Sequence, residues 1–334
     1  MEVELVKRAG VPFEAIPAAG LHGVGLRALP GNTIRLLRGY RSARDVLDRF
    51  QPDALFFTGG YVAVPMALAG RKIPALLFVP DIEPGLALKV LTHFADKIAV
   101  SSEESLAFFP ARSDLSVTGY PTRPELKPIS REEARAKFGI SGELPVLMVF
   151  GGSSGARSIN RALLTILPDL LGEMHIIHVS GRLDWEQIAG ERERLTSKLG
   201  ARASLADRYQ VFPYLHEEMG TALSAADLVV SRAGASSLGE LPLFGLPAVL
   251  VPYPYAWRYQ MVNAEYLAQR GAAVIIADQD LPKRLAAVVK GLMNDREKLE
   301  GMRRAMSALA RPEAASAIAG LLTGLASKVG QKRK

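Results

Sequence analysis

The sequence predicts an α/β protein built from two doubly wound domains, each with a parallel sheet of its own. Three observations support this fold class. The chain has 334 residues, of which 49% are hydrophobic, and this is enough to bury two cores of ordinary size. Short apolar segments typical of strands alternate with helical segments along nearly the whole chain. Several of these strands end in glycine or small hydroxyl residues, as strands do where a doubly wound fold binds a ligand.

Composition excludes several classes of function. The chain lacks cysteine, which excludes disulfides, thiol catalysis and cysteine-bound zinc, and its five histidines show no metal-binding spacing. No apolar run is long enough to span a bilayer and no signal peptide is visible, so we expect a cytosolic or peripheral protein. The net charge of +7 predicts attraction to polyanions, and an aromatic content of only 7% disfavours nucleic acid among them.

The N-terminal segment predicts a helix, a short strand and an apolar loop, in that order. We expect the helix at Glu2–Ala9, the strand at Phe13–Ile16, and a loop rich in leucine and glycine at Leu21–Gly31. Arginines then recur at intervals of three along one helical face, at positions Arg35, Arg38, Arg41 and Arg44. An apolar loop beside such a row suits an anionic membrane surface, although a solvated helix face would give the same pattern.

Four strands are predicted in the rest of the first domain, with a helix after the first of them. The first strand ends in Gly59, Gly60 and Tyr61, and the second is followed by a proline-flanked loop with two carboxylates, Asp81 and Glu83. Because the alternation implies a parallel sheet, we expect these loops to share its carboxyl edge. The strands are predicted at Asp53–Thr58, Pro74–Val79, Lys97–Ser101 and Ser116–Thr118, and the helix at Val62–Gly70.

A linker with two prolines, at 124–129, separates the domains, and Ser130 with Glu133 predicts a capping box that starts a new helix. We therefore divide the chain into an N-terminal domain, 1–125, and a C-terminal domain, 126–311, and expect a helix at 312–328 to complete the first. The predicted strands of the second domain are Val146–Phe150, His175–Ser180, Tyr209–Phe212, Leu228–Ser231, Ala248–Val251 and Val274–Ala277. Its helices are expected from Ala156, from Asp184, and at Glu217–Ala225, Leu238–Phe244 and Gln260–Arg270, and two more finish the chain.

Two strand-to-helix turns of the second domain are the best candidates for a binding site. One is Gly151–Gly155, and the other is Ala233–Ser237. Small residues there let a ligand approach the backbone, and the free N–H groups of two helix ends favour a diphosphate. Glu240, one helical turn later, is placed to accept hydrogen bonds from a ribose diol. Small residues needed only for the chain reversal remain an alternative, and neither the P-loop spacing nor the dinucleotide fingerprint is present.

At several places in order along the chain, these and other segments match one known family. They are Gly59–Val62, Gly119–Arg123, Gly151–Arg157 with Asn160, Ser231–Ala235, Gly239–Leu241 with Gly245–Pro247, and Arg258–Gln260 with Asn263–Ala264. In these motifs the chain resembles the MurG family, transferases that add N-acetylglucosamine from a UDP donor to the lipid-linked muramoyl-pentapeptide precursor of peptidoglycan. The resemblance implies a B-type glycosyltransferase fold, with two Rossmann-like domains facing across a cleft, and an inverting reaction with no required metal and no cofactor beyond the UDP-N-acetylglucosamine donor.

The resemblance also implies roles for individual residues. Arg123 and Ser153 would contact the donor, Met219 would pack near the uracil, and Gln260 would address the sugar hydroxyls. The segment that would hold phosphate and ribose, with the diol on the glutamate, comprises Gly234, Ala235, Ser236, Ser237, Leu238, Gly239 and Glu240. The acceptor side would include Gly59, Gly60 and Tyr61, and Asp81 is the candidate catalytic group. The implied partners are a UDP-sugar, a polyprenyl-diphosphate-linked acceptor and an anionic membrane, at the cytoplasmic face of which the protein would lie peripherally.

Two departures from the family pattern leave alternatives open. The family begins with a strand and a glycine-rich loop bearing a histidine, roughly GGTGGH, whereas this chain starts at a later segment, so its N-terminal domain is expected to be incomplete. The HEQN segment of the family corresponds here to Phe78-Val79-Pro80-Asp81. An active transferase is the first hypothesis. A truncated, non-catalytic UDP-sugar-binding homologue and a related lipid glycosyltransferase or sugar-nucleotide epimerase are the alternatives.

Overall fold

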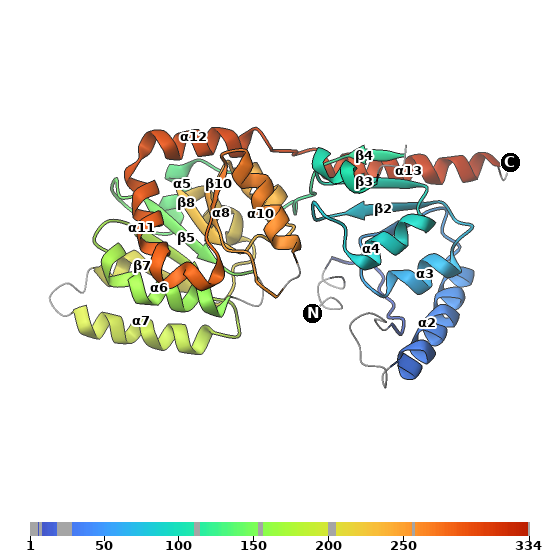
Figure 1. The fold of residues 1–334 in the computed structure, drawn as a ribbon, viewed down its shortest axis with the longest axis horizontal. Helices are drawn as coiled ribbons and strands as arrows, with labels where there is room; N and C mark the ends of the chain where they lie inside the picture. The colour runs from blue at the N-terminus through green and yellow to red at the C-terminus, as the bar shows by residue number, and fades with distance from the viewer. Residues whose placement is uncertain are drawn as a thin grey trace.

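The computed structural model describes residues 6, 9–18, 29–109, 114–152, 156–199, 205–255 and 258–332. Within these residues the chain forms two α/β domains side by side, each around a fully parallel sheet (Figure 1). The predicted fold class of two parallel-sheet α/β domains is confirmed. The sheets lie end to end with a helical and loop-rich junction between them (Figure 1).

The N-terminal sheet has four parallel strands in the order β1-β2-β3-β4, which is also their order along the chain. They are β1 Leu55–Phe57, β2 Ala75–Val79, β3 Lys97–Val100 and β4 Leu115–Val117. All five residues of β2 are buried, as expected for a central strand covered on both faces. Alternate side chains of β2 therefore pack into two different cores, Leu77 into one and Leu76 into the other.

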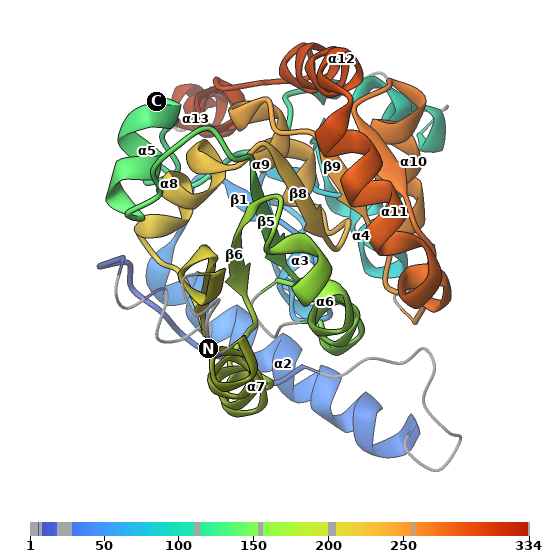
Figure 2. The same ribbon diagram turned by 90° about the vertical axis from the view of Figure 1, so that its left-hand side faces the viewer.

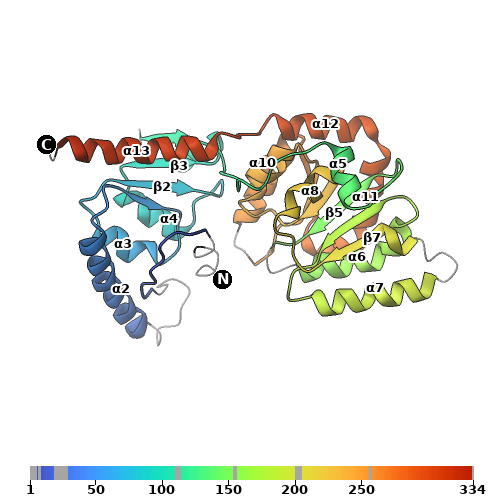
Figure 3. The same ribbon diagram turned by 180° about the vertical axis from the view of Figure 1, so that it is seen from behind.

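Helices from opposite ends of the chain cover the two faces of this sheet. On one face lie α2 Leu29–Phe50, α3 Ala63–Ala69 and α4 Leu86–Leu91, followed by the 3₁₀ helices η2 Thr92–Phe94 and η3 Glu103–Phe108. On the other face lies α13 Ala314–Lys332, whose Ile318 and Leu325 pack with Leu76 and Phe78. Figures 1 and 3 show α13 returning from the C-terminal domain to cross the N-terminal sheet. The last helix thus supplies a layer that the first domain needs.

The C-terminal sheet has six parallel strands in the order β10-β9-β8-β5-β6-β7. They are β5 Val146–Phe150, β6 His175–Val179, β7 Tyr209–Phe212, β8 Leu228–Ser231, β9 Ala248–Leu250 and β10 Ala273–Ile275. Strand β5 is first in the chain and lies between β6 and β8, so the order of strands reverses at the β5/β8 pair. Such a reversal opens a crevice beyond the carboxyl ends of the two strands, where doubly wound folds bind ligands.

The helices of this domain divide into two layers according to the core that they enter. One core receives α5 Arg131–Lys137, α8 Glu218–Ala225, α9 Ser237–Phe244 and α10 Tyr259–Gln269. The other receives α6 Arg157–Leu170, α7 Trp185–Leu199 and α11 Leu281–Asn294, and η5 Asp278–Asp280 precedes α11. The last helix of the domain, α12 Arg296–Ser307, contributes Met302 to one core and Met306 to the other. Figure 2 shows α6 and α11 on one side of β5 and β8, and α5 and α8 on the other.

Two predicted elements differ in the structure. Residues 11–18 form no strand, because Glu14 and Pro17 lie against α2, where Glu14 pairs with Arg49, and α2 offers no strand edge for the backbone to pair with. Three helices, not two, finish the chain, because Asp295 ends α11 and caps α12 by accepting a hydrogen bond from the Lys298 amide. The predicted helix at 2–9 and most of the loop at 21–31 fall outside the described residues.

Candidate active site

The candidate site begins at the carboxyl ends of β5 and β8. Phe150 and Ser231, the last residues of the two strands, are paired in the ladder. The turn that follows each strand therefore starts beside the other, and both turns lead into helices, α6 and α9. The structure brings together the two turns that the sequence singled out, at the one place in this sheet where the strand order reverses.

The turn after β8 exposes backbone donors at the start of α9. The Ser237 hydroxyl donates to the Gly234 carbonyl oxygen at 2.6 Å, and the Ser237 amide donates to the same oxygen at 3.0 Å, which closes the turn. In the described part of the chain, the amides of Ala235 and Ser236 donate to no protein group. Free N–H groups at a helix start, supported by the helix dipole, are suited to a phosphate.

The turn after β5 depends on a glycine. Gly152 has φ +90°, a left-handed conformation that residues with a side chain rarely adopt, although a Cβ there would meet no atom. Ala156 then precedes α6 and is buried. The predicted donor contact Ser153 falls outside the described residues, together with Ser154 and Gly155. The structure describes the chain again from Ala156, and α6 begins at Arg157.

Glu240 lies in the first turn of α9, half-buried, with Arg123 of the N-terminal side acting on it. Burial raises the pKa of the Glu240 carboxyl, and the positive charge of Arg123 acts in the opposite direction. Burial also raises the pKa of Tyr120, with further contributions from the charges of Glu240 and Asp81. At the junction of the domains, four side chains are therefore close enough for their charges to affect one another's pKa: Tyr120, Arg123, Asp81 and Glu240. A carboxylate that burial has partly desolvated gains most from a hydrogen-bond donor on a ligand.

The backbone of the N-terminal side approaches this helix very closely. A Cβ on Gly239 would come within 2.7 Å of the Tyr120 carbonyl oxygen, so only glycine fits there. Ser237, Leu238 and Gly239 are all buried by this contact and by the core beneath. Gly239 is thus required by a contact between the domains, and its presence is not evidence for a bound ligand.

Asn263 joins the two domains. This side chain is fully buried on α10, and its amide donates to Asp81 Oδ1 at 2.7 Å and to the Ala233 carbonyl oxygen at 3.1 Å. Its own oxygen accepts a hydrogen bond from the Ile82 amide at 3.1 Å. These three hydrogen bonds of Asn263 tie the loop after β2 to the turn after β8. The candidate catalytic group and the candidate phosphate turn are therefore held by a single residue.

Asp81 combines burial with one occupied oxygen. Burial raises the pKa of its carboxyl, and the hydrogen bond from Asn263 lowers it again in part. Nearby, Arg258 Nε lies 2.7 Å from Glu83 Oε2, an ion pair that also joins this loop to the start of α10. Among the described residues, the hydrogen bond to Asp81 uses Oδ1 and leaves Oδ2 without a donor. A carboxylate with a raised pKa is a stronger proton acceptor.

The predicted acceptor-side residues follow β1 at the same edge of the N-terminal sheet. Gly59 and Gly60 have φ +109° and +81°, so both require the freedom of glycine, and Tyr61 is 48% exposed. Tyr61, Asp81 and Glu83 all influence the pKa of Tyr259 on α10, which burial raises first. The loops after β1 and β2 are thereby placed opposite the start of α10.

Gln260 and Met219 lie in different surroundings. The Gln260 side-chain oxygen accepts a hydrogen bond from the Tyr253 amide at 2.8 Å, and Gln260 lines a cavity of about 640 Å³ together with Gly151, Arg157 and Arg232. Met219 is 8% exposed in the core cluster that also contains Leu238. The structure thus groups Gln260 with the β5 turn, and Met219 with the interior of α8 and α9.

Sequence reasoning missed two features of the site. Asn263 appeared only as part of a motif, although a polar residue between Val262 and Ala264 on an otherwise apolar helix face could have marked it as bonded in the interior. Tyr120 was also missed, and its contacts depend on the packing of one domain against the other. Neither role can be read from spacing along the chain.

Two absences apply to the described residues alone. Within them, no three His, Asp or Glu side chains are grouped as a metal site would require. Over the same residues, the structure contains no helix that combines the length and apolar character needed to cross a bilayer.

Family comparisons agree over nearly the whole chain. The model of the glycosyltransferase family 28 C-terminal domain matches residues 146–318. The model of the corresponding N-terminal domain matches residues 1–100. The first match contains all six strands of the C-terminal sheet, and the second contains β1, β2 and β3 of the N-terminal sheet.

Curated relatives with one name match almost all of this chain. A protein of Roseiflexus sp. (strain RS-1) is 41% identical over 97% of this chain and 81% of its own length. A protein of Desulforudis audaxviator (strain MP104C) is 39% identical over 98% of this chain and 88% of its own. Both are named UDP-N-acetylglucosamine--N-acetylmuramyl-(pentapeptide) pyrophosphoryl-undecaprenol N-acetylglucosamine transferase.

Solved structures share the fold. Acinetobacter baumannii MurG superposes with a TM-score of 0.72 at 26% identity, over 97% of this chain and 88% of that protein. A UDP-GlcNAc 2-epimerase from Neisseria meningitidis, bound to UDP-GlcNAc, gives a TM-score of 0.61 at 13% identity over 97% and 88%, a likeness of fold alone.

Proposed function

This chain belongs to glycosyltransferase family 28, within the MurG family, and from that premise we propose that it transfers N-acetylglucosamine from UDP-N-acetylglucosamine to an undecaprenyl-diphosphate-linked N-acetylmuramyl-pentapeptide. The reaction is a hexosyl transfer in peptidoglycan synthesis. Among the hypotheses raised by the sequence, this one accounts for the relatives of highest identity, and the epimerase alternative has a likeness of fold alone.

The observation that carries the proposal is the pairing of β5 with β8 at the reversal of strand order. It places two helix starts side by side, with the free amides of Ala235 and Ser236 at one of them and half-buried Glu240 one turn away. A nucleoside diphosphate needs donors for its phosphates and an acceptor for its ribose diol, and this arrangement offers both.

The proposed mechanism is a direct displacement at the anomeric carbon, which inverts its configuration. The acceptor hydroxyl loses its proton to Asp81 while UDP departs, and the negative charge that develops on the diphosphate is stabilised by the two helix starts. Because these backbone groups supply the electrostatic stabilisation, we propose that the reaction needs no metal. Asn263 holds Asp81 at the turn that binds the phosphates.

Calorimetric titration with UDP tests the donor site. Glu240→Ala removes the proposed acceptor for the ribose diol, and we expect affinity to fall by about 1 to 3 kcal/mol, as for a lost charge-assisted hydrogen bond. Glu265→Ala is the matched control, because Glu265 is exposed on α10. Unchanged UDP affinity in Glu240→Ala, beside a normal control, would show that the ribose binds elsewhere.

Titration of UDP at several pH values tests the same contact. Ribose hydroxyls donate to the ionised form of Glu240, so binding stabilises the carboxylate and lowers its raised pKa. Affinity should therefore decline as pH falls through the raised pKa of the free protein, and Glu240→Gln should flatten this decline. An identical pH profile in the variant would remove Glu240 from the nucleotide contact.

Turnover of Asp81→Asn tests the catalytic base. Asn can still accept the hydrogen bond from Asn263, so the loop should keep its position while the proton acceptor is lost. We expect the turnover number to fall roughly 10²- to 10⁴-fold with UDP affinity unchanged. Normal turnover would exclude Asp81 as the base.

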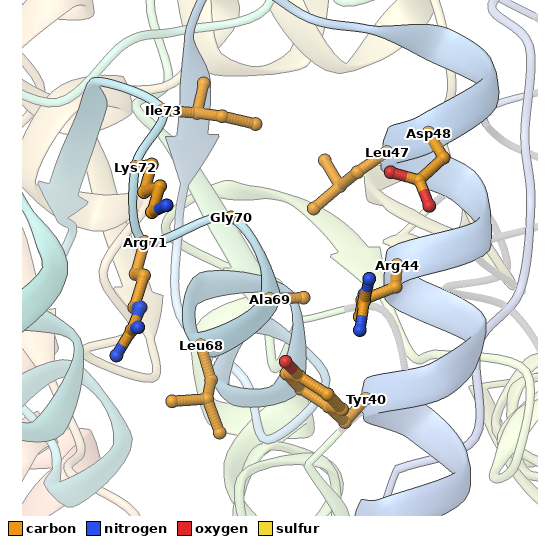
Figure 4. Close-up of a pocket in the computed structure, with 10 residues that line it drawn as sticks. All are labelled: Tyr40, Arg44, Leu47, Asp48, Leu68, Ala69, Gly70, Arg71, Lys72 and Ile73. Atoms are coloured by element: carbon orange, nitrogen blue, oxygen red, sulfur yellow. The ribbon is translucent and has the colours of Figure 1, made fainter.

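We further propose that α2 binds the anionic surface on which a lipid-linked acceptor is presented. Ile34 and Leu37 on this helix are 50% and 60% exposed. The four arginines of the row, Arg35, Arg38, Arg41 and Arg44, are all exposed. A cavity of about 540 Å³ adjoins the helix, where Arg44 and Tyr40 face Leu68 of α3 (Figure 4), and Arg71 and Lys72 also line it. Exposed apolar side chains beside cations are typical of peripheral membrane contacts.

Sedimentation with vesicles tests this surface. The protein should bind vesicles that contain acidic phospholipid, and replacing the four arginines of α2 by glutamine should weaken binding by about 1 kcal/mol for each arginine. The matched control replaces four exposed cations of the C-terminal domain, Lys283, Arg284, Lys298 and Arg304. Equal losses in both quadruple variants would mean that only net charge matters.

A further inference from the structure

A chain of buried polar side chains runs along the α6 face of the C-terminal sheet and ends at an exposed arginine. Tyr209 and His178 lie on neighbouring strands, with the Tyr209 hydroxyl 2.8 Å from His178 Nδ1. His178 Nε2 lies 2.9 Å from Asn160 Oδ1, and the Asn160 amide donates to Asp184 Oδ2 at 2.9 Å. Asp184 Oδ1 accepts from Arg157 Nε at 3.0 Å. We call these residues the buried relay.

Donor counting fixes the direction of every hydrogen bond in the relay. The Asn160 amide nitrogen donates to Asp184 and to the Ser180 carbonyl oxygen, so its Oδ1 can only accept. His178 must then carry its proton on Nε2, which leaves Nδ1 as the acceptor for the Tyr209 hydroxyl. Complete burial lowers the pKa of His178 to about 3, so the ring stays neutral near neutral pH. One tautomer of His178 and one orientation of Asn160 satisfy the relay.

The relay orients Arg157 through one nitrogen of its guanidinium, Nε. Asp184 is 5% exposed and fixed by Asn160, whereas the Arg157 side chain is 63% exposed. Only Nε of Arg157 is engaged with Asp184, so its two terminal nitrogens remain open to an anion in the described structure. A carboxylate fixed by a buried hydrogen bond holds an arginine in one geometry, and this lowers the entropy lost when the arginine binds a ligand.

Arg157 lines the 640 Å³ cavity together with Arg161 and Arg232. Arg232 is already engaged by protein groups, because it donates to Asp278, to Ser158 and to the Val251 carbonyl oxygen. Arg161 is exposed, and within the described residues its guanidinium has no partner. The cavity therefore offers two arginines with open donors and a net positive charge, with the exposed rings of Tyr253 and Tyr255 as one wall.

The cavity meets the proposed nucleotide site at the β5 turn and the start of α6, and lies apart from the turn after β8. Its lining includes Gly151 and Gln260 but none of the residues 233–240 that would hold phosphate and ribose. If Gln260 addresses the sugar of the donor, the cavity starts where the transferred sugar ends. An anion bound there would belong to the second substrate.

We infer that this cavity binds an anionic group of the acceptor, a phosphate or a carboxylate, through Arg157 and Arg161, with Arg157 oriented by the buried relay. The inference rests on the proposed function, because the acceptor named there carries both a diphosphate and a peptide with carboxylates. Arg157 and Arg161 are binding residues. Asp184, Asn160, His178 and Tyr209 are positioning residues, which act through Arg157.

Equilibrium binding of the intact protein to the detergent-solubilised, lipid-linked muramyl-pentapeptide tests the inference without requiring turnover. We expect Arg157→Gln and Arg161→Gln each to weaken acceptor binding about tenfold, with UDP-N-acetylglucosamine affinity changed less than twofold. Arg304→Gln, on an exposed arginine of α12, is the matched control and should change neither affinity.

A second acceptor with amidated peptide carboxylates identifies the group bound. If the anion is a carboxylate, this analogue should bind the wild type weakly and be insensitive to Arg157→Gln. If the anion is the diphosphate, the tenfold loss should persist. Normal acceptor affinity in both arginine variants, or weakening of the donor alone, overturns the inference while the proposed function stands. A wild-type protein that binds neither substrate overturns both.

Removing the charge of Asp184 tests the relay. Asp184→Asn can still accept the hydrogen bond from the Asn160 amide, but it replaces the carboxylate that holds Arg157 Nε, so acceptor affinity should fall about as far as in Arg157→Gln. A purely structural relay would lower the melting temperature of Asp184→Asn and leave the acceptor affinity of its folded fraction unchanged. In nitrogen NMR spectra, His178 should be protonated at Nε2, and protonation at Nδ1 would contradict the assigned relay.

Discussion

The two sheets differ in the order of their described strands, and the proposed nucleotide site lies where one of them reverses its order. The C-terminal sheet reverses its order at β5 and β8, so two turns diverge from adjacent strands and leave a crevice. The described N-terminal sheet runs from β1 to β4 without a reversal. Its loops after β1 and β2 contribute Tyr61, Asp81 and Glu83 to the junction of the domains. The difference in strand order thus locates the proposed nucleotide site at the β5/β8 pair of the C-terminal sheet.

The means of attachment also differ between the two halves. Within the C-terminal domain the elements are consecutive in sequence from 131 to 307. The N-terminal domain depends on α13, which arrives from the end of the chain, and on contacts across the junction such as Asn263 with Asp81 and Arg270 with Glu104. We therefore expect perturbations of these contacts to affect the N-terminal half first.

Removing the contact of α13 with the N-terminal sheet should separate the two halves most clearly. Ile318 is 6% exposed, and Ile318→Ala should lower the free energy of unfolding by about 2 to 5 kcal/mol through lost burial and a cavity. Calorimetry should show the loss in the transition of the N-terminal domain, with UDP affinity retained. Thr323→Ala, on an exposed position of the same helix, is the control. Equal destabilisation of both domains would mean that they unfold as one unit.

Asn263→Ala tests the junction at the cleft. The substitution leaves Asp81 Oδ1, the Ile82 amide and the Ala233 carbonyl oxygen without their partner, at a cost of up to about 3 kcal/mol. Turnover should fall more than UDP affinity, because the loop after β2 loses its position while the β5/β8 crevice stays intact. A variant with lower UDP affinity and normal turnover would contradict the idea that Asn263 serves the junction.

The pH dependence of stability should reveal His178, which belongs to the C-terminal half. Its folded pKa of about 3 lies below the unfolded value of about 6.5, so the unfolded state binds the extra proton as pH falls through this window. Stability is therefore lost on acidification, by about 2 kcal/mol at pH 5 relative to pH 8 from this group. His178→Gln should remove that part of the decline in denaturant titrations. Identical slopes for the two proteins would show that the ring is not buried and neutral.

The smallest effect is expected at the surface of the N-terminal half. Arg49 and Glu14 form an ion pair with side chains 66% and 52% exposed, and it holds residues 11–18 against α2. Exposed ion pairs contribute less than about 1 kcal/mol, so Arg49→Ala should shift the denaturation midpoint little, and less still at high salt. A loss of several kcal/mol would mean that the 11–18 segment is part of the N-terminal core.

Much of the fold was predictable, because buried parallel strands are continuous apolar runs. The segments 146–150, 209–212 and 228–231 were predicted as strands and match β5, β7 and β8 residue for residue. Residues 13–16 show where this reasoning fails. An apolar, extended segment becomes a strand only if a neighbouring edge pairs with its backbone, and here the neighbour is α2.

Local chemistry of the sequence determined the turns and the start of each helix. Gly151 and Gly152 after an apolar run predict a strand-to-helix turn, and Ser130 predicts the helix that it caps, with the Glu133 amide donating to its hydroxyl at 3.2 Å. Such features depend on residues a few positions apart, so one sequence window contains their whole physical cause.

Only the tertiary structure decided which distant residues act together. Asn263 meets Asp81 although 182 positions separate them, and α13 covers a sheet that starts far earlier in the chain. The orientation of Arg157 likewise depends on Tyr209 through three intermediate side chains. Hydrogen bonds of this kind require both partners to be buried at a fixed distance, and packing of the two domains and of neighbouring strands sets that distance. The sequence by itself therefore determined the elements and the turns that face a ligand, whereas the fold determined how the cleft is closed.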